Sequence, residues 1–148
     1  MALPNNEIAR VALHKITLTN FRCYKRASLE VDSRSVVLTG PNGAGKTNLL
    51  EAVSLLAPGR GLRRARLEDM DRRNESIRES TNEWGIAASI ETPLGPIQIG
   101  TGRIKTSGNR RIIRINGADT KSQNTLAEYV DAVWLTPKMD RLFAEGAT

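Results

Sequence analysis

Histidine and cysteine are scarce in this 148-residue chain, which contains one of each, His14 and Cys23. A single cysteine excludes an intrachain disulfide framework. A single histidine gives no ligand set for a transition metal, so a structural role for His14 is expected. No run of roughly 18 apolar residues is present, and the N-terminus lacks the apolar core of a secretion signal. These absences predict a cytoplasmic protein with no membrane span.

Aromatic residues are also few, at 4% of the chain, although 39% of the residues are hydrophobic and can form a core. Positive charge, in contrast, is plentiful: the formal net charge is +6, and arginine is far commoner than lysine. The planar arginine side chain forms paired hydrogen bonds with phosphate, so nucleic acid is a reasonable partner. The same charge balance also fits a soluble protein without such a partner.

A glycine-rich loop follows the short apolar segment Val36–Leu38, which has the composition of a buried strand. The loop fits the phosphate-binding pattern GxxxxGK[ST], and the apolar residues after it recur at helical spacing. A strand, a glycine loop and a helix in this order are the context that the pattern requires. A turn that merely caps a helix is the alternative. The predicted phosphate-binding residues are Gly40, Pro41, Asn42, Gly43, Ala44, Gly45, Lys46 and Thr47.

The chemistry of this loop indicates a bound nucleotide and a magnesium ion. Glycines let the main chain approach a phosphate closely, and the amide groups at a helix N-terminus favour negative charge. Lys46 can reach the β- and γ-phosphates, and the Thr47 hydroxyl can ligate a magnesium ion between them. The loop alone does not identify the reaction.

Strand patterns dominate the rest of the chain. Alternation predicts a strand over Val11–Phe21, with an irregularity near His14, and a second over Ala27–Val31. We expect the charged segment at residues 59–83 to be a loop or a short helix. Turn residues then punctuate an antiparallel meander. Its strands are Trp84–Ile90, Pro96–Gly100 and Arg111–Ile115. A short helix at Leu126–Val130, a strand or strand end at Asp131–Thr136 and a helix at Pro137–Ala144 are expected to follow.

One part of a nucleotide-hydrolysing site is missing from the sequence. Such sites hold magnesium and water with an acid that ends a second apolar strand. The nearest candidate, Ile86–Glu91, carries a serine within the run and belongs to the antiparallel pattern, so Glu91 is expected at the surface. Ser107–Asn109 is interpreted as a turn and not as the signature sequence of an ABC-type ATPase.

Four segments of the chain match one family: LTNFRCY (Leu18–Tyr24), GPNGAGKTNLLEA (Gly40–Ala52), LLAPGRGLR (Leu55–Arg63), and VWLTP with the MDRLF that follows it (Val133–Phe143). Together they resemble the RecF family of bacterial DNA replication and repair ATPases, which is related to the ABC and SMC head domains. The phosphate loop is shared by many families, whereas GKTNLLEA followed by PGRGLR at this spacing is far more specific. The resemblance extends from about Leu13 to the end of the chain.

The resemblance implies an α/β P-loop NTPase fold. Residues 1–148 would form the N-terminal lobe of an ABC-type ATPase head, with a mixed sheet and an antiparallel subsheet. In that family the signature sequence and the acidic Walker B strand belong to the C-terminal part, which would explain why this chain lacks them. The chain alone is therefore expected to be inactive in hydrolysis.

The function implied by the resemblance is ATP binding within a DNA-binding ATPase of recombinational repair, replication recovery and the SOS response. The implied cofactors are ATP and Mg²⁺. The implied partners are single- or double-stranded DNA, a second copy in an ATP-dependent dimer, and other recombination mediator proteins.

Candidate site residues outside the phosphate loop also follow from the resemblance. Asn20 and Arg22 match the family's N-F-R stretch near the nucleotide, with a strand-end turn as the alternative. The Trp134–Pro137 segment resembles the connector that carries a magnesium-sensing glutamine in ABC heads, but it contains no glutamine. Arginines after the first helix are expected to contact the DNA backbone, with a solvated charged loop as the alternative. They are Arg60, Arg63, Arg64 and Arg66.

Two other functions fit parts of the sequence. A stand-alone small P-loop kinase would use an arginine-rich lid, which residues 59–73 could supply, but such kinases alternate strands with helices and the second half of this chain does not. A DNA-binding module with a degenerate loop would not bind ATP at all.

Overall fold

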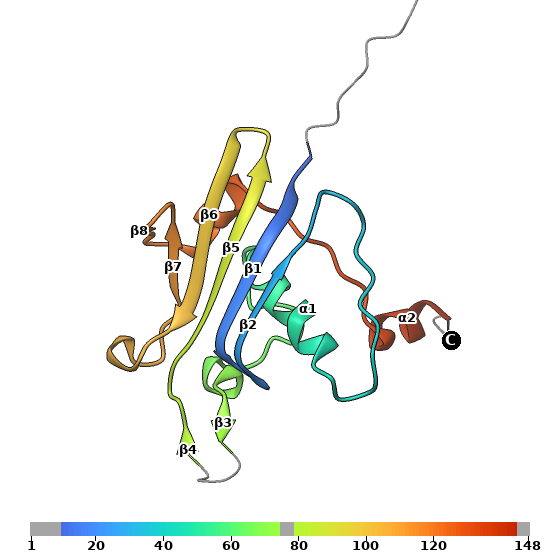
Figure 1. Ribbon diagram of the computed structural model, residues 1–148, viewed down its shortest axis with the longest axis horizontal. Coiled ribbons are helices and arrows are strands. Elements are labelled where there is room, and N and C mark those ends of the chain that lie inside the picture. The colour runs from blue at the N-terminus through green and yellow to red at the C-terminus, as the bar shows by residue number, and fades with distance from the viewer. Residues whose placement is uncertain (1–9, 75–78, 145–148) are drawn as a thin grey trace, which may run out of the picture.

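The computed structural model describes residues 10–74 and 79–144, which are built on one antiparallel sheet with a helix against one face (Figure 1). The six strands lie in the order β2-β1-β5-β6-β7-β8. β1 forms a hairpin with β2 and also pairs with β5, so segments far apart in the sequence meet within the sheet. The strands are β1 (Ala12–Phe21), β2 (Tyr24–Glu30), β5 (Trp84–Thr92), β6 (Gly95–Arg103), β7 (Ile112–Ile115) and β8 (Ala118–Asp119).

Short elements complete the described chain. α1 (Lys46–Ser54) follows the glycine-rich loop, and α2 (Pro137–Ala144) begins at the proline that the sequence places at a helix start. β3 (Arg73–Asn74) pairs only with β4 (Glu79–Ser80). The 3-10 helices are η1 (Leu67–Met70), η2 (Lys105–Ser107) and η3 (Gln123–Glu128). No helix within the described ranges is both long and apolar enough to cross a lipid bilayer.

Alternation of side chains builds the core between the sheet and α1. Along β5, Trp84, Ile86 and Ile90 are buried, whereas the residues between them on the other face are more exposed. Leu55, directly after α1, belongs to the same buried cluster. The ring of Phe21 packs edge-on against Trp84, with ring centroids 5.5 Å apart. This packing fixes α1, and with it the loop that precedes the helix, against the sheet.

The predicted antiparallel meander is confirmed. β5, β6 and β7 pair in register, and the turn at Asn116–Gly117 joins β7 to β8 with positive φ values of 50° and 83°. The irregularity expected near His14 is also present, because the register of β1 against β5 shifts between Leu13 and Lys15.

Two predicted strands are not formed among the described residues. Val36–Leu38 lies outside every strand pairing, and Val36 and Val37 are 52% and 82% exposed. Asp131–Thr136 is likewise unpaired, with Val133 97% exposed. A strand exists only where a second backbone takes up its hydrogen bonds, and no described segment does so for either one. Apolar side chains of both segments are therefore exposed, and no described strand pairs with either segment.

The secondary structure of two other segments agrees only in part with the prediction. The charged segment at residues 59–83 contains the expected loop and short helix, which is η1, but it also forms the paired strands β3 and β4, which were not predicted. Residues 75–78 lie outside the described part. The helix expected at Leu126–Val130 is instead the 3-10 helix η3. It starts earlier because Ser122 Oγ accepts a hydrogen bond from Asn124 N and caps it.

Candidate phosphate-binding site

The glycine-rich loop takes a backbone path that depends on its glycines. Gly40, Gly43 and Gly45 have φ values of 149°, 83° and 95°, which residues with a side chain rarely adopt. Space is also restricted at Gly45, since an added Cβ would lie 2.6 Å from Tyr24 Oη and 2.9 Å from Cys23 Sγ. The positions of these glycines in the sequence pattern therefore follow from the loop geometry and from the β1–β2 turn against it.

The start of α1 presents unpaired main-chain N–H groups. Gly45 is the N-cap residue, no described side chain caps the helix, and the hydrogen bond from Leu49 N to Gly45 O is 3.0 Å long. In the described part of the chain, no main-chain acceptor pairs with the N–H groups of Gly45, Lys46 or Thr47. Free N–H groups at the positive end of a helix form a site for an anion such as phosphate.

Lys46 lies folded over the loop. Its Nζ donates to Gly40 O and Pro41 O at 2.5 and 2.8 Å. Thr47 is exposed at the next position. The described residues contain no group of three or more His, Cys, Asp or Glu side chains that could hold a metal ion on their own. The free N–H groups and the ammonium group of Lys46 fit a phosphate group. The Thr47 hydroxyl fits a magnesium ion that would take its other ligands from phosphate and water.

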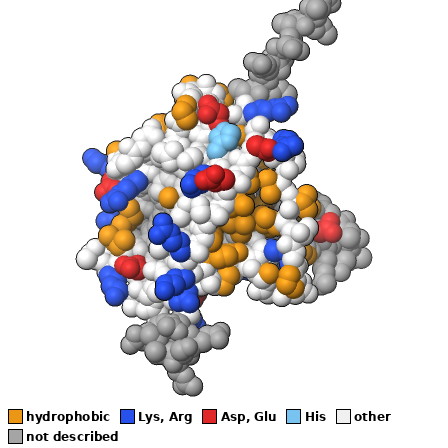
Figure 2. Space-filling view, in the orientation of Figure 1, with side chains coloured by type: hydrophobic (Ala, Val, Ile, Leu, Met, Phe, Trp, Pro, Cys, Tyr) orange, Lys and Arg blue, Asp and Glu red, His pale blue; other side chains and the backbone are white. Residues whose placement is uncertain are grey.

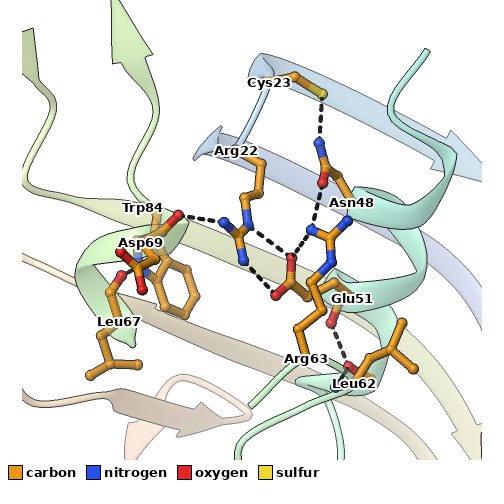
Figure 3. A network of polar contacts seen from close by, with 10 residues as sticks. Arg22, Cys23, Asn48, Glu51, Leu62, Arg63, Leu67, Asp69 and Trp84 are labelled. Carbon is orange, nitrogen blue, oxygen red and sulfur yellow. Dashed lines mark hydrogen bonds and ion pairs between the residues drawn. The ribbon is translucent and has the colours of Figure 1, made fainter. Parts of the chain in front are cut away.

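A buried carboxylate on α1 organises the surroundings of the loop (Figure 3). Glu51 is 1% exposed and accepts hydrogen bonds from Arg22 Nε and Nη2 at 2.8 and 2.7 Å. Arg63 Nη1 donates to the same carboxylate at 3.0 Å. Two guanidinium groups thus offset the cost of burying one charge. Sequence reasoning misses Glu51, and the signal that could have found it is an acid placed within the apolar repeat of a helix.

The hydrogen bonds around Glu51 join four segments, and we call this set the Glu51 network (Figure 3). Arg22 Nη1 donates to Asp69 O at 2.6 Å, which connects the β1–β2 turn to η1. Arg63 Nη1 donates to Asn48 Oδ1 at 2.9 Å, and Asn48 Nδ2 donates to Cys23 Sγ at 3.2 Å. The network therefore ties the arginine-rich loop and the β1–β2 turn to the helix that carries the phosphate loop. Its members are Arg22, Cys23, Asn48, Glu51, Arg63 and Asp69.

The β1–β2 turn supports the phosphate loop directly. Tyr24 Oη donates to Gly45 O at 3.0 Å. Burial, and next the nearby Cys23, raises the pKa of the Tyr24 hydroxyl, so this group keeps its proton at neutral pH. The loop is thus held at its C-terminal end by a hydrogen bond from a neighbouring strand.

Asn20 and Arg22, predicted to lie near a nucleotide, both have positive φ values, 50° and 53°, at the end of β1. Asn20 O accepts a hydrogen bond from Arg72 N, and Arg22 N donates to Met70 O, each at 2.9 Å. The side chain of Arg22 is held in the Glu51 network. The structure therefore gives both residues a role at the end of β1, and nucleotide contact by either one stays a prediction.

The four arginines predicted to contact DNA have different surroundings. Arg63 is held by Glu51, whereas Arg66 Nη1 lies 3.8 Å from Glu68 Oε1 and its side chain is 76% exposed. Arg60 and Arg64 are exposed, and neither has an ion-pair partner in the described ranges. DNA contact by these arginines stays a prediction.

Comparison with known proteins gives one family. The sequence profile of the RecF/RecN/SMC N terminal domain matches residues 12–139. The DNA replication and repair protein RecF of Caulobacter sp. (strain K31) is 47% identical over 148 residues, which cover 95% of this chain and 37% of that protein. The protein of the same name from Agrobacterium fabrum (strain C58 / ATCC 33970) is 47% identical over 141 residues, with 94% and 36% covered. The chain thus spans little more than a third of the length of these relatives.

Solved structures agree on the fold. The structure of the recombination mediator protein RecF-ATP in the RecFOR pathway matches 80% of this chain and 31% of its own, with a TM-score of 0.67 and 27% identity. A structure from a study of ATP-driven dimerization and DNA stimulated activation of SMC ATPases matches 90% of this chain and 98% of its own, with a TM-score of 0.66. Its identity of 17% shows the fold alone. The predicted α/β P-loop NTPase fold is confirmed.

Proposed function

Because the chain belongs to the RecF/RecN/SMC N-terminal domain family, we propose that it is the ATP-binding lobe of a RecF-type ATPase acting in DNA replication and repair. The observation that carries this proposal is the start of α1. Glycines with positive φ, unpaired N–H groups and the ammonium group of Lys46 all lie within one short loop there.

Each part of the loop has a task in this proposal. The N–H groups of residues 43–47 would bind phosphate oxygens, Lys46 would neutralise the β- and γ-phosphates, and the Thr47 hydroxyl would ligate Mg²⁺. The Glu51 network would hold α1 in place against the end of β1, where Asn20 and Arg22 lie. A magnesium ion bound by Thr47 would withdraw negative charge from the phosphates.

The wider role is proposed from the relatives. In the longer proteins, ATP would join two such lobes on DNA, in recombinational repair, replication recovery and the SOS response, together with other recombination mediator proteins in the cytoplasm. The name of a RecF-ATP recombination mediator and the ATP-driven dimerization of SMC ATPases support this proposal. A stand-alone kinase has less support, because the second half of the described chain is an antiparallel meander.

The test is the change of Lys46 to alanine. Removing a charge-assisted contact should weaken binding of a fluorescent MgATP analogue by about 1.5–3 kcal/mol. The fold should survive, because Lys46 Nζ bonds only to two carbonyls of the loop among the described residues. The matched control is Lys25→Ala, which removes an exposed lysine from β2. Equal affinities for the Lys46→Ala variant and the parent chain would show that the loop does not bind phosphate.

A further inference from the structure

The Tyr24 side chain contacts the phosphate loop from a neighbouring element. Its Oη donates a 3.0 Å hydrogen bond to Gly45 O, the carbonyl oxygen directly before Lys46. The same side chain restricts Gly45 sterically, since a Cβ added there would lie 2.6 Å from Tyr24 Oη and 2.9 Å from Tyr24 Cζ. Tyr24 therefore limits both the direction of this carbonyl group and how closely the loop can approach the β1–β2 turn.

Gly45 does not fix the direction of its carbonyl group by itself. It is the N-cap residue of α1, with φ 95° and ψ 6°, and glycine has more backbone freedom than any other residue. Among the described residues, the other donor to Gly45 O is Leu49 N, in the first turn of the helix. No described side chain caps this end, and helix ends fray. The bond from Tyr24 is thus the contact from outside the helix that holds this carbonyl group.

The direction of the Gly45 carbonyl group decides the direction of the Lys46 N–H group. The two belong to one planar peptide unit, in which C=O and N–H point in opposite directions. The Lys46 N–H has no main-chain acceptor among the described residues, and it lies at the positive end of α1, which favours an anion. Rotation of this peptide unit would turn the N–H away from a bound phosphate and point the carbonyl oxygen toward it.

Tyr24 is itself held by elements other than the loop. It lies opposite Phe21 in the β1–β2 hairpin, and its side chain packs against the core. The preceding residue, Cys23, accepts a 3.2 Å hydrogen bond at Sγ from Asn48 Nδ2, which ties the turn to α1 (Figure 3). The position of the Tyr24 hydroxyl is therefore set by the sheet and the helix, and the loop adapts to it.

We propose that Tyr24 is a positioning residue of the phosphate site, which holds the peptide unit between Gly45 and Lys46 so that the Lys46 N–H donates to a phosphate of the nucleotide. This inference rests on the proposed function, which supplies the nucleotide. It adds to the site a residue that lies outside the loop pattern. Tyr24 acts through the loop and does not touch the ligand, so its effect is the same for every ligand whose phosphates occupy the loop.

The test is Tyr24→Phe, which removes one oxygen and keeps the ring that packs against the core. Affinity for a fluorescent MgATP analogue should fall about three- to tenfold, as expected for the loss of one hydrogen bond. Affinity for magnesium tripolyphosphate, which has neither base nor sugar, should fall by the same factor. The matched control is Tyr129→Phe, which changes the other tyrosine of the chain. Tyr129 also packs against the core but does not bond to Gly45.

A second readout follows the Lys46 N–H group itself. With isotope-labelled lysine amides, the NMR resonance of Lys46 should move when the chain is saturated with either ligand. It should move less in Tyr24→Phe than in the parent chain or in Tyr129→Phe. A loss of stability alone does not change this shift, because the shift reports the folded, bound state. Replacing Tyr24 by para-aminophenylalanine returns a donor to the ring and should restore both the affinity and the shift.

Equal affinities of Tyr24→Phe and the parent chain overturn the proposal, as does an equal shift of Lys46 in the bound state. A loss confined to the nucleotide, with tripolyphosphate unaffected, also overturns it, because Tyr24 would then contact the base or the sugar. A parent chain that binds neither ligand contradicts the proposed function and this inference together. If the parent chain binds both ligands and Tyr24→Phe behaves like Tyr129→Phe, only the role of Tyr24 fails.

Discussion

At the scale of single residues, Gly45 is under two constraints, one of backbone conformation and one of space. Its φ is 95°, and a Cβ there would overlap Tyr24 Oη at 2.6 Å. Gly43 has a similar φ of 83°, but nothing lies within 4 Å of the position of its Cβ. Substitution of Gly43 therefore tests backbone strain alone, whereas substitution of Gly45 tests backbone strain together with steric overlap.

We expect Gly43→Ala to cost about 1–2 kcal/mol of stability through backbone strain alone. Gly45→Ala should cost about 1–3 kcal/mol more, because Tyr24 and Cys23 must move. The same movement should weaken binding of a MgATP analogue more than the Gly43 change does. Urea denaturation and nucleotide titration of the two variants measure these differences. Equal losses of stability would mean that the β1–β2 turn does not support the loop.

Glu51 is the residue on which the arrangement around the phosphate loop depends. Glu51→Gln leaves Arg22 and Arg63 without their shared counter-charge, and we expect a loss of about 3 kcal/mol in the free energy of unfolding. The control is Glu30→Gln, which breaks an exposed pair with Lys15 and should change stability little. Thermal and urea denaturation of both variants distinguish them, and similar small losses would show that the Glu51 network contributes little to the fold.

At the scale of elements, the sequence predicts the antiparallel strands better than the strand before the phosphate loop. The alternation in Trp84–Ile90 has a partner close in the sequence, since β5 and β6 are joined by a tight turn. Val36–Leu38 has the same apolar character, but a strand also needs a partner strand, which its own residues do not reveal. No such partner is present among the described segments. The loop itself is predictable because its glycines and Lys46 act through local backbone geometry.

The side-chain connections between elements are beyond sequence reasoning for a related reason. Glu51 and Arg22 are 29 positions apart, and Arg111 and Leu55 are 56 apart, so no spacing rule relates them. Their pairing follows from the meeting of β1, α1 and β7 around one core. A charged residue inside an apolar repeat, as at Glu51, indicates that a partner exists but does not identify it.

The Arg111 side chain connects segments far apart in the sequence, and no sequence pattern predicts these contacts. Arg111→Lys keeps the charge but removes the planar group that reaches acceptors at Leu55, Gly59 and Gln123, so we expect a loss of about 3 kcal/mol in stability. Hydrogen exchange at η3 should become faster, because the hydrogen bond from Arg111 to Gln123 is weakened.

The control for this prediction is Arg114→Lys on β7, where the partner Asp119 is exposed. It should leave both stability and exchange close to the values of the parent chain. If Arg111→Lys behaves in the same way, the contacts of Arg111 do not hold these elements together.

At the scale of the whole molecule, the described surface has an apolar side. Hydrophobic side chains gather on one side of the sheet in Figure 2. Val37, Val133 and Leu135, from the two unpaired segments, are 82%, 97% and 68% exposed. Exposed apolar residues on segments with free main-chain groups favour association with another chain.

We therefore expect the 148-residue chain to self-associate as its concentration rises, as measured by analytical ultracentrifugation. Val37→Lys with Val133→Lys should increase the fraction of monomer, because charge opposes both burial and strand pairing. The control is Leu94→Lys, which changes an equally exposed apolar residue in the β5–β6 turn. A monomeric parent chain, or an equal effect of the control, would contradict this prediction.

The pairing of β1 with β5 also sets an order of events during synthesis. The β1–β2 hairpin can form as soon as it leaves the ribosome, but the other edge of β1 stays open until β5 has been made. The phosphate loop and α1 are translated in this interval, before Trp84 and Ile86 exist to complete the core behind them. Closing so long a segment is slow compared with forming a hairpin. In a nascent chain the phosphate loop is therefore held against a complete core only after β5 has been made.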